Sequence, residues 1–234
     1  MFHYYSEAAA GDGKSMFGLN KDPELHRFLI VDPARTAKSR SCPSAILAVA
    51  TDYNRGRVHF RKTIARRMSQ DALLDTAFTT AFDMNTKVIG VEITGLGDAG
   101  KWMWMNYASQ HGYKNIEFVW LEGTDLPKGD WGAGDDAAKR ARASQGLPLY
   151  QKHMVYHEES LRGGILETME LSYPLCSSWD IMDCMGYVPT MLHMAGRVFA
   201  TKQPGPHEAP LPKWDDDQWE EITQRLREGS WRRV

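Results

Sequence analysis

The hydrophobic period of the chain changes near residue 69, and this change limits the possible folds more than any other feature. Before it, three apolar or alternating runs are separated by turn residues, a pattern typical of strands joined as antiparallel hairpins. After it, segments with helical spacing alternate with β-branched runs, which predicts strands connected by helices. The expected strands are 28–31, 45–50, 57–64, 87–92 and 116–121, and the expected helices are 69–82 and 98–111.

This order predicts an α/β domain with a mixed sheet, antiparallel over its first three strands, then parallel, and flanked by helices. Further elements are expected after the Gly/Asp-rich loop at 123–135: a short basic helix near Lys139, a strand near 154–155, a helix through Leu166, and a helix over 178–194. The whole domain should cover residues 27–195.

Segments of different composition flank this domain. Residues 1–26 are small and polar and should form an arm with little regular structure. Prolines in the segment 196–213 predict an extended linker. Residues 214–234 should form a tail that is helical over 214–228 and contains the acidic run 215–217, which would repel nucleic acid and suits protein docking.

Charge and cysteine content exclude several classes of protein. The 28 Lys and Arg residues against 30 Asp and Glu give a formal charge of −2, unlike a uniformly basic histone-like or ribosomal protein. No run approaches the roughly 18 apolar residues of a membrane span, and the N-terminus lacks a secretory signal. Three cysteines do not make a disulfide scaffold, so a reducing cytosol is expected.

Two glycine-rich motifs suggest nucleotide binding, but both have the wrong context. Residues 8–15 match a loose phosphate-loop pattern, yet neither a strand before them nor a helix after them is expected. Residues 95–100 read GxGxxG between a strand and a helix. They follow an antiparallel hairpin, and Glu92 would oppose a pyrophosphate there.

Four acids stand where carboxylates could converge. Asp32 and Glu92 each end a strand, whereas Asp180 and Asp183 lie at i and i+3 on a late helix. An acid at the end of an apolar strand is costly unless it is compensated, and Mg²⁺ or Mn²⁺ takes such hard oxygen ligands. Singly, each acid could be a turn, cap or solvated residue. Together and in this order, they match the layout of a ribonuclease-H-like nuclease.

These residues also resemble the nuclease domain of the large terminase subunit of tailed bacteriophages. The matching segments are 28–34, 88–97, 137–142 and 177–187, and the resemblance covers about 27–195. It implies Asp32, Glu92 and Asp180 as principal metal ligands and catalytic residues, with Asp183 as a further ligand. Because Trp179 stands where the family often has a second acid, the choice between Asp180 and Asp183 stays open. The glycines after Glu92 also fit this family.

The resemblance implies a Mg²⁺- or Mn²⁺-dependent DNA endonuclease that cuts concatemeric double-stranded DNA with two ions. Its implied partners are a terminase ATPase domain, the portal and the small terminase subunit, and its implied location is the cytoplasm of an infected bacterium. The sequence contains no motor, so we expect an excised domain or a separately encoded nuclease. The alternatives are a non-catalytic DNA-binding or packaging-assembly module of the same fold and a junction-resolving nuclease.

Clustered cations could provide a track for the DNA backbone. One cluster, at 55–67, contains no acid, and two others follow Asp32 and occupy the basic helix. Each cluster could equally be a solvated face. The candidate DNA-binding residues are Arg35, Lys38, Arg55, Arg57, Arg61, Lys62, Lys139 and Arg142. Lys139 or Arg142 is expected to hold the scissile phosphate.

Overall fold

The computed structural model describes residues 2–6, 25–34, 43–93, 97–113, 115–121, 135–175 and 180–198, with backbone only for 135–140 and 195–198. Its strands are β1 (His3–Tyr5), β2 (Leu25–Asp32), β3 (Ser44–Asp52), β4 (Arg57–Arg66), β5 (Val88–Glu92), β6 (Glu117–Leu121) and β7 (Val155–Glu158). Its helices are α2 (Gln70–Asp83), α3 (Gly97–Gln110), α4 (Asp135–Gln151), α5 (Ile165–Ser172), α6 (Asp180–Gly186) and α7 (Val188–Val198), with a 3₁₀ turn at Glu159–Leu161.

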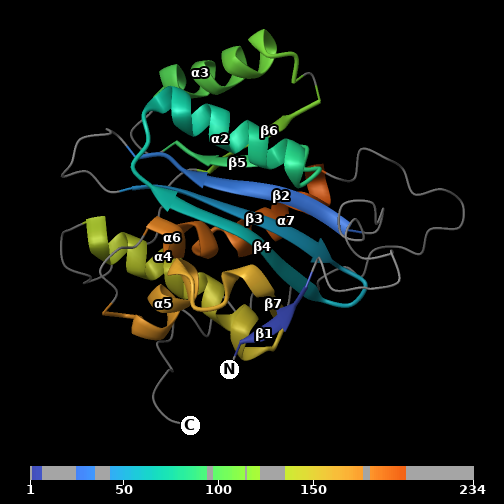
Figure 1. Cartoon of the computed structure of the whole chain (residues 1–234), viewed down its shortest axis with the longest axis vertical. Helices are drawn as coiled ribbons and strands as arrows, with labels where there is room; N and C mark the ends of the chain where they lie inside the picture. The colour runs from blue at the N-terminus through green and yellow to red at the C-terminus, as the bar shows by residue number, and fades with distance from the viewer. Residues whose placement is uncertain are drawn as a thin grey trace, which may run out of the picture.

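The strands form one mixed sheet in the order β1-β7-β4-β3-β2-β5-β6 (Figure 1). Strands β2, β3 and β4 are antiparallel neighbours, and β5 and β6 continue the sheet parallel to β2. This arrangement confirms the predicted ribonuclease-H-like sheet. On the other side, β7 pairs in parallel with β4, and β1 in parallel with β7.

Helices cover both faces of the sheet, and the sequence of β2 explains why. Phe28 and Ile30 pack with α4, α6 and α7, whereas Leu29 and Val31 pack with α2 and α3. A strand buried on both faces needs a continuous apolar run rather than alternation. Figure 1 shows α2 and α3 on one side of the sheet and α4, α5 and α6 on the other. In the described part of the chain, no helix is long and apolar enough to cross a membrane.

The N-terminal residues differ from the expected arm, because residues 3–5 form the edge strand β1. Phe2 stacks on His157 of β7 with ring centroids 4.9 Å apart, and Tyr5 meets His59 of β4 at the same distance. The pairing covers the edge of β7 that would otherwise present open backbone groups.

The helices after residue 134 also differ from expectation. Helix α4 spans 17 residues and continues through Pro148, so it is much longer than the short basic helix predicted. The single late helix is divided into α6 and α7 at Tyr187. Pro189 has no N–H to donate back to the preceding turn, which explains the break.

Several predicted features lie outside the described residues. They include the phosphate-loop match at 8–15, the loop at 123–134, the tail, and the linker beyond residue 198. Of the GxGxxG motif, residues 97–100 are described, and they open α3. Gly97 has a φ of +56°, a conformation that suits glycine.

Candidate metal centre

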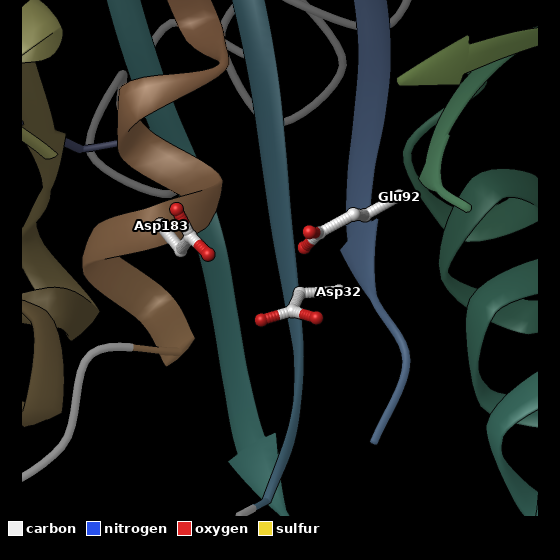
Figure 2. Close-up of side chains that lie close together, drawn as sticks. All are labelled: Asp32, Glu92 and Asp183. Atoms are coloured by element: carbon white, nitrogen blue, oxygen red, sulfur yellow. The ribbon is translucent and has the colours of Figure 1, made fainter. Parts of the chain in front are cut away.

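The strand-end acids meet because β2 and β5 are parallel neighbours. Val31 pairs with Val91, so Asp32 and Glu92 follow directly at the same edge of the sheet. Helix α6 packs on this part of the sheet and brings Asp183 to it. One carboxylate oxygen from each of Asp32, Glu92 and Asp183 lies within 4.8 Å of the others. Figure 2 shows Asp183 across from the two strand residues, with the three carboxylates close together.

Between the two helix acids, the structure places Asp183 rather than Asp180 in the cluster. Asp180 is buried at the start of α6 but is absent from the group of converging acids among the described residues. The two residues are three apart, which separates them by about 4.5 Å along the helix axis. The expectation that Asp180 is a principal ligand therefore does not match this geometry.

Arg142 of α4 forms a bidentate salt bridge with Asp183. Its Nε donates to Oδ1 at 2.5 Å and its Nη2 to Oδ2 at 2.6 Å, while Nη2 lies 3.7 Å from Oε1 of Glu92. The residue is 7% exposed. Burial alone would lower the pKa of Arg142, but the hydrogen bonds and charge of Asp183 outweigh it and raise that pKa. In this structure Arg142 therefore serves as an internal counter-ion of the acid cluster.

Two glycines let α4 and α6 approach closely enough for this pairing. A Cβ added to Gly186 would lie 2.3 Å from the carbonyl oxygen of Arg142. A Cβ on Gly146 would lie 3.0 Å from Cε of Met185. The backbone of α6 therefore rests directly on the turn of α4 that carries Arg142.

Tyr187 belongs to the same cluster, although it is not among the predicted site residues. Its ring lies beside the guanidinium of Arg142, with 5.6 Å between Cζ and the ring centroid. The residue is 2% exposed, and its hydroxyl has no hydrogen-bond partner within the described structure. Burial, followed by the charge of Glu92, raises its pKa far above the ordinary value. The sequence signal that could have identified Tyr187 is its position four residues after Asp183, because residues at this spacing lie on the same face of a helix.

The residues present fit a divalent cation. Oxygen ligands on opposite sides of Mg²⁺ or Mn²⁺ are separated by roughly 4 to 4.5 Å, which agrees with the spread of the three carboxylates. Their three formal negative charges exceed the single positive charge of Arg142, so a divalent ion would complete the balance. The three acids and Arg142 are all buried. The excess negative charge of the acids is therefore costly unless a cation binds there.

Arg61 does not face a DNA surface as predicted. It is 3% exposed, and Nη1 donates to the backbone carbonyl of Met84 at 2.9 Å. This contact ties β4 to the end of α2. Its role is structural because a buried guanidinium occupied in this way cannot meet a phosphate.

Arg55 and Arg57 lie at the wrong end of the sheet for the metal centre. Asp32 pairs with Ala45, and Ala45 pairs with Ala65, so the acids lie beside the C-terminal end of β4. Arg57 is eight residues earlier, about 26 Å along the strand. Its guanidinium lies over Tyr156, and Arg55 pairs with Asp52 at 2.9 Å. Neither residue borders the acid cluster, so a role of Arg55 and Arg57 in DNA binding stays a prediction.

Other cationic residues either lie nearer to the acid cluster or stay predictions as DNA-binding residues. Arg66 and Arg67 are exposed at the acid end of β4, and they belong to the same basic run of the sequence. Lys62 is half-buried nearer the middle of the strand. Arg35 and Lys38 lie outside the described residues, as does the side chain of Lys139.

The fold and the acid cluster together define a ribonuclease-H-like domain with a candidate metal centre. No protein-family model matches the sequence, and no curated protein matches it either. Several solved structures are similar to it at low sequence identity, and three of them are described below.

The first is the human cytomegalovirus terminase nuclease domain, soaked with Mn (TM-score 0.49, 14% identity, 84% of this chain and 92% of that one). The second is the fowlpox virus Holliday junction resolvase (TM-score 0.46, 10% identity, with 72% of this chain and 99% of the resolvase chain covered). The third is the nuclease domain of the large terminase subunit of bacterial virus Sf6 (TM-score 0.43, 15% identity, with 68% of this chain and 87% of the Sf6 chain covered).

Proposed function

We propose that this chain is a metal-dependent endonuclease that cuts double-stranded DNA as the nuclease part of a viral DNA-packaging terminase. The observation that carries the proposal is the convergence of Asp32, Glu92 and Asp183 from three separate elements at one edge of the sheet. Hard-cation centres of phosphodiester cleavage need this donor set. The resemblance of the matching sequence segments to phage terminase nucleases supports the packaging role.

Each side chain has a definite task in this proposal. Asp32, Glu92 and Asp183 would hold two Mg²⁺ or Mn²⁺ ions, which when bound activate a water and stabilise the departing 3′ oxygen. The strand residues are fixed by the pairing of β2 with β5. Arg142 would offer its guanidinium to the scissile phosphate when Asp183 is engaged elsewhere, and Lys139 is the other candidate.

The DNA itself would approach from the acid end of the sheet. Arg66 and Arg67 are exposed there, and cations beside a cleavage centre add affinity for phosphates without reading sequence. In the packaging role, the partners would be a terminase ATPase domain, the portal and the small terminase subunit. The site of action would be the cytoplasm of the infected bacterium.

Plasmid nicking with Mn²⁺ tests the proposal. Glu92→Gln on β5 should abolish nicking, whereas the matched change Glu117→Gln on the neighbouring strand β6 should leave it unchanged, because Glu117 is exposed at the far end of that strand. Undiminished cleavage by Asp32→Ala would overturn the ligand assignment. Wild-type protein that binds DNA but stays inert at every Mn²⁺ concentration would indicate the non-catalytic module. Preferential cutting of four-way junctions would indicate a resolvase.

A further inference from the structure

The hydroxyl of Tyr187 is a buried polar group for which the described residues offer no hydrogen-bond partner. Folded proteins pair nearly all such groups, because an unpaired buried hydroxyl costs free energy. The backbone at Tyr187 is fixed, since its N–H donates to the carbonyls of Asp183 and Cys184, and its own carbonyl accepts from Met191. Mobility of the backbone at Tyr187 therefore does not explain why its hydroxyl is unpaired within the described structure.

The ring that carries this hydroxyl lies beside the acid centre. Tyr187 follows Asp183 by one helical turn, and Arg142 lies beside its ring. The guanidinium is already engaged by Asp183 and lies near Glu92. Burial, followed by the charges of Glu92, Asp183 and Asp32, raises the pKa of the phenol against the opposing charge of Arg142, so the hydroxyl keeps its proton and can donate.

We propose that the Tyr187 hydroxyl is a positioning donor for an oxygen ligand that enters the acid centre. The group that accepts this hydrogen bond is an oxygen atom. It belongs either to a water that accompanies the cation or to a non-bridging phosphate oxygen of DNA. This inference rests on the proposed function and adds a residue to it. Tyr187 touches neither the acids' metal-binding oxygens nor the scissile bond in this assignment; it orients the incoming oxygen.

The decisive variant is Tyr187→Phe, which keeps the ring beside Arg142 and removes only the hydroxyl. Because that hydroxyl has no partner among the described residues, the melting temperature without metal should stay the same or rise. A matched control is Tyr53→Phe, whose hydroxyl donates to the carbonyl of Leu192 at 3.2 Å, away from the centre. That control should lower the melting temperature without changing ligand affinity.

Two binding measurements identify the acceptor. Mn²⁺ affinity without DNA, measured by electron paramagnetic resonance, should fall about tenfold in Tyr187→Phe if the acceptor is a water of the cation. The affinity for a short DNA duplex in Ca²⁺, measured by fluorescence anisotropy, should fall about tenfold with unchanged Mn²⁺ affinity if the acceptor is a phosphate oxygen. Either loss supports a positioning role, because a purely structural hydroxyl would change the melting temperature instead.

Equal affinities of wild type and Tyr187→Phe in both measurements would overturn the inference while leaving the nuclease proposal intact. Wild-type protein that binds no Mn²⁺ would overturn the proposed metal centre, and this inference with it. A lower melting temperature of Tyr187→Phe without metal would also contradict it, because that result requires a hydrogen bond already present in the free protein.

Discussion

Arg142 and Asp183 meet edge to edge, with two hydrogen bonds of 2.5 and 2.6 Å between guanidinium and carboxylate. The residues come from different helices, and both are buried. The same guanidinium lies 3.7 Å from Glu92. It therefore neutralises part of the acid centre in the absence of a metal, and a cation that binds Asp183 must compete with it. The energetics of the centre depend on this competition.

The two helix acids should differ sharply in metal binding. Asp183→Asn should lose Mn²⁺ affinity and nicking by at least a hundredfold, because its carboxylate converges with Asp32 and Glu92. Asp180→Asn should keep Mn²⁺ affinity within about threefold, since it lies a turn away. Titration with Mn²⁺ of the two variants checks this. An equal loss in Asp180→Asn would restore that residue as a principal ligand.

Removal of Arg142 should destabilise the protein without metal and increase the stabilising effect of Mn²⁺. Arg142→Met removes the guanidinium that donates two hydrogen bonds to the buried Asp183, and breaking one side of a buried pair costs about 3–5 kcal/mol. Mn²⁺ would then bind Asp183 without competition from the guanidinium of Arg142. Thermal melts with and without Mn²⁺ measure both effects, and Arg55→Met, which removes an exposed guanidinium that pairs with Asp52, is the control. The same Mn²⁺ shift in Arg142→Met and wild type would contradict the competition.

The glycine contact between α4 and α6 should be intolerant of a methyl group. In Gly186→Ala, the new Cβ meets the Arg142 carbonyl, which is backbone and cannot move alone. We expect a loss of about 1–3 kcal/mol from overpacking, together with weaker nicking, because the helix that carries Arg142 must shift. Gly146→Ala first meets the flexible end of Met185 and should cost less. Urea unfolding of both variants gives the comparison, and the reverse order would refute this account.

A second buried polar cluster sits on the α4 and α5 side of the sheet. His157 lies 2.9 Å from Glu167 through Nδ1 and 2.7 Å from the Tyr150 hydroxyl through Nε2. Tyr150 is also hydrogen-bonded to Glu170. Burial raises the pKa of Glu170 to about 8 and lowers the pKa of His157. Both groups are therefore mainly uncharged in the folded protein near pH 7.

This cluster predicts a stability that falls as the pH rises. Because the pKa of Glu170 is raised from 4.5 to about 8 on folding, the folded state binds the proton more tightly than the unfolded state. The resulting contribution is complete below about pH 4.5 and is lost by about pH 8. Glu170→Gln cannot ionise and should remove this loss.

Urea unfolding of wild type and Glu170→Gln between pH 5 and pH 9 tests the prediction. Relative to the variant, the wild type should lose about 1–3 kcal/mol of unfolding free energy across this range. Glu159→Gln is a suitable control because Glu159 is half exposed. A constant difference between wild type and Glu170→Gln at all pH values would show that Glu170 does not titrate in this range.

Much of the fold followed from local patterns in the sequence. The apolar run of β2 indicated a strand buried on both faces, and the change of period near residue 69 indicated where helices begin to alternate with strands. Asp32 and Glu92 were identified because an acid at the end of an apolar strand is unusual. These signals are local, since the period of a segment reports which of its faces is buried.

Pairings between distant residues could be decided only by the tertiary structure. The choice of Asp183 over Asp180, the burial of Arg142 against it and the approach of Tyr187 all depend on how α4 and α6 pack on the sheet. The direction of β4 likewise placed Arg55 and Arg57 far from the acids. Residues 41 positions apart in sequence meet in the Arg142–Asp183 pair. The period of a segment specifies a buried face but not the side chain that it will meet, and that partner is set by packing between elements.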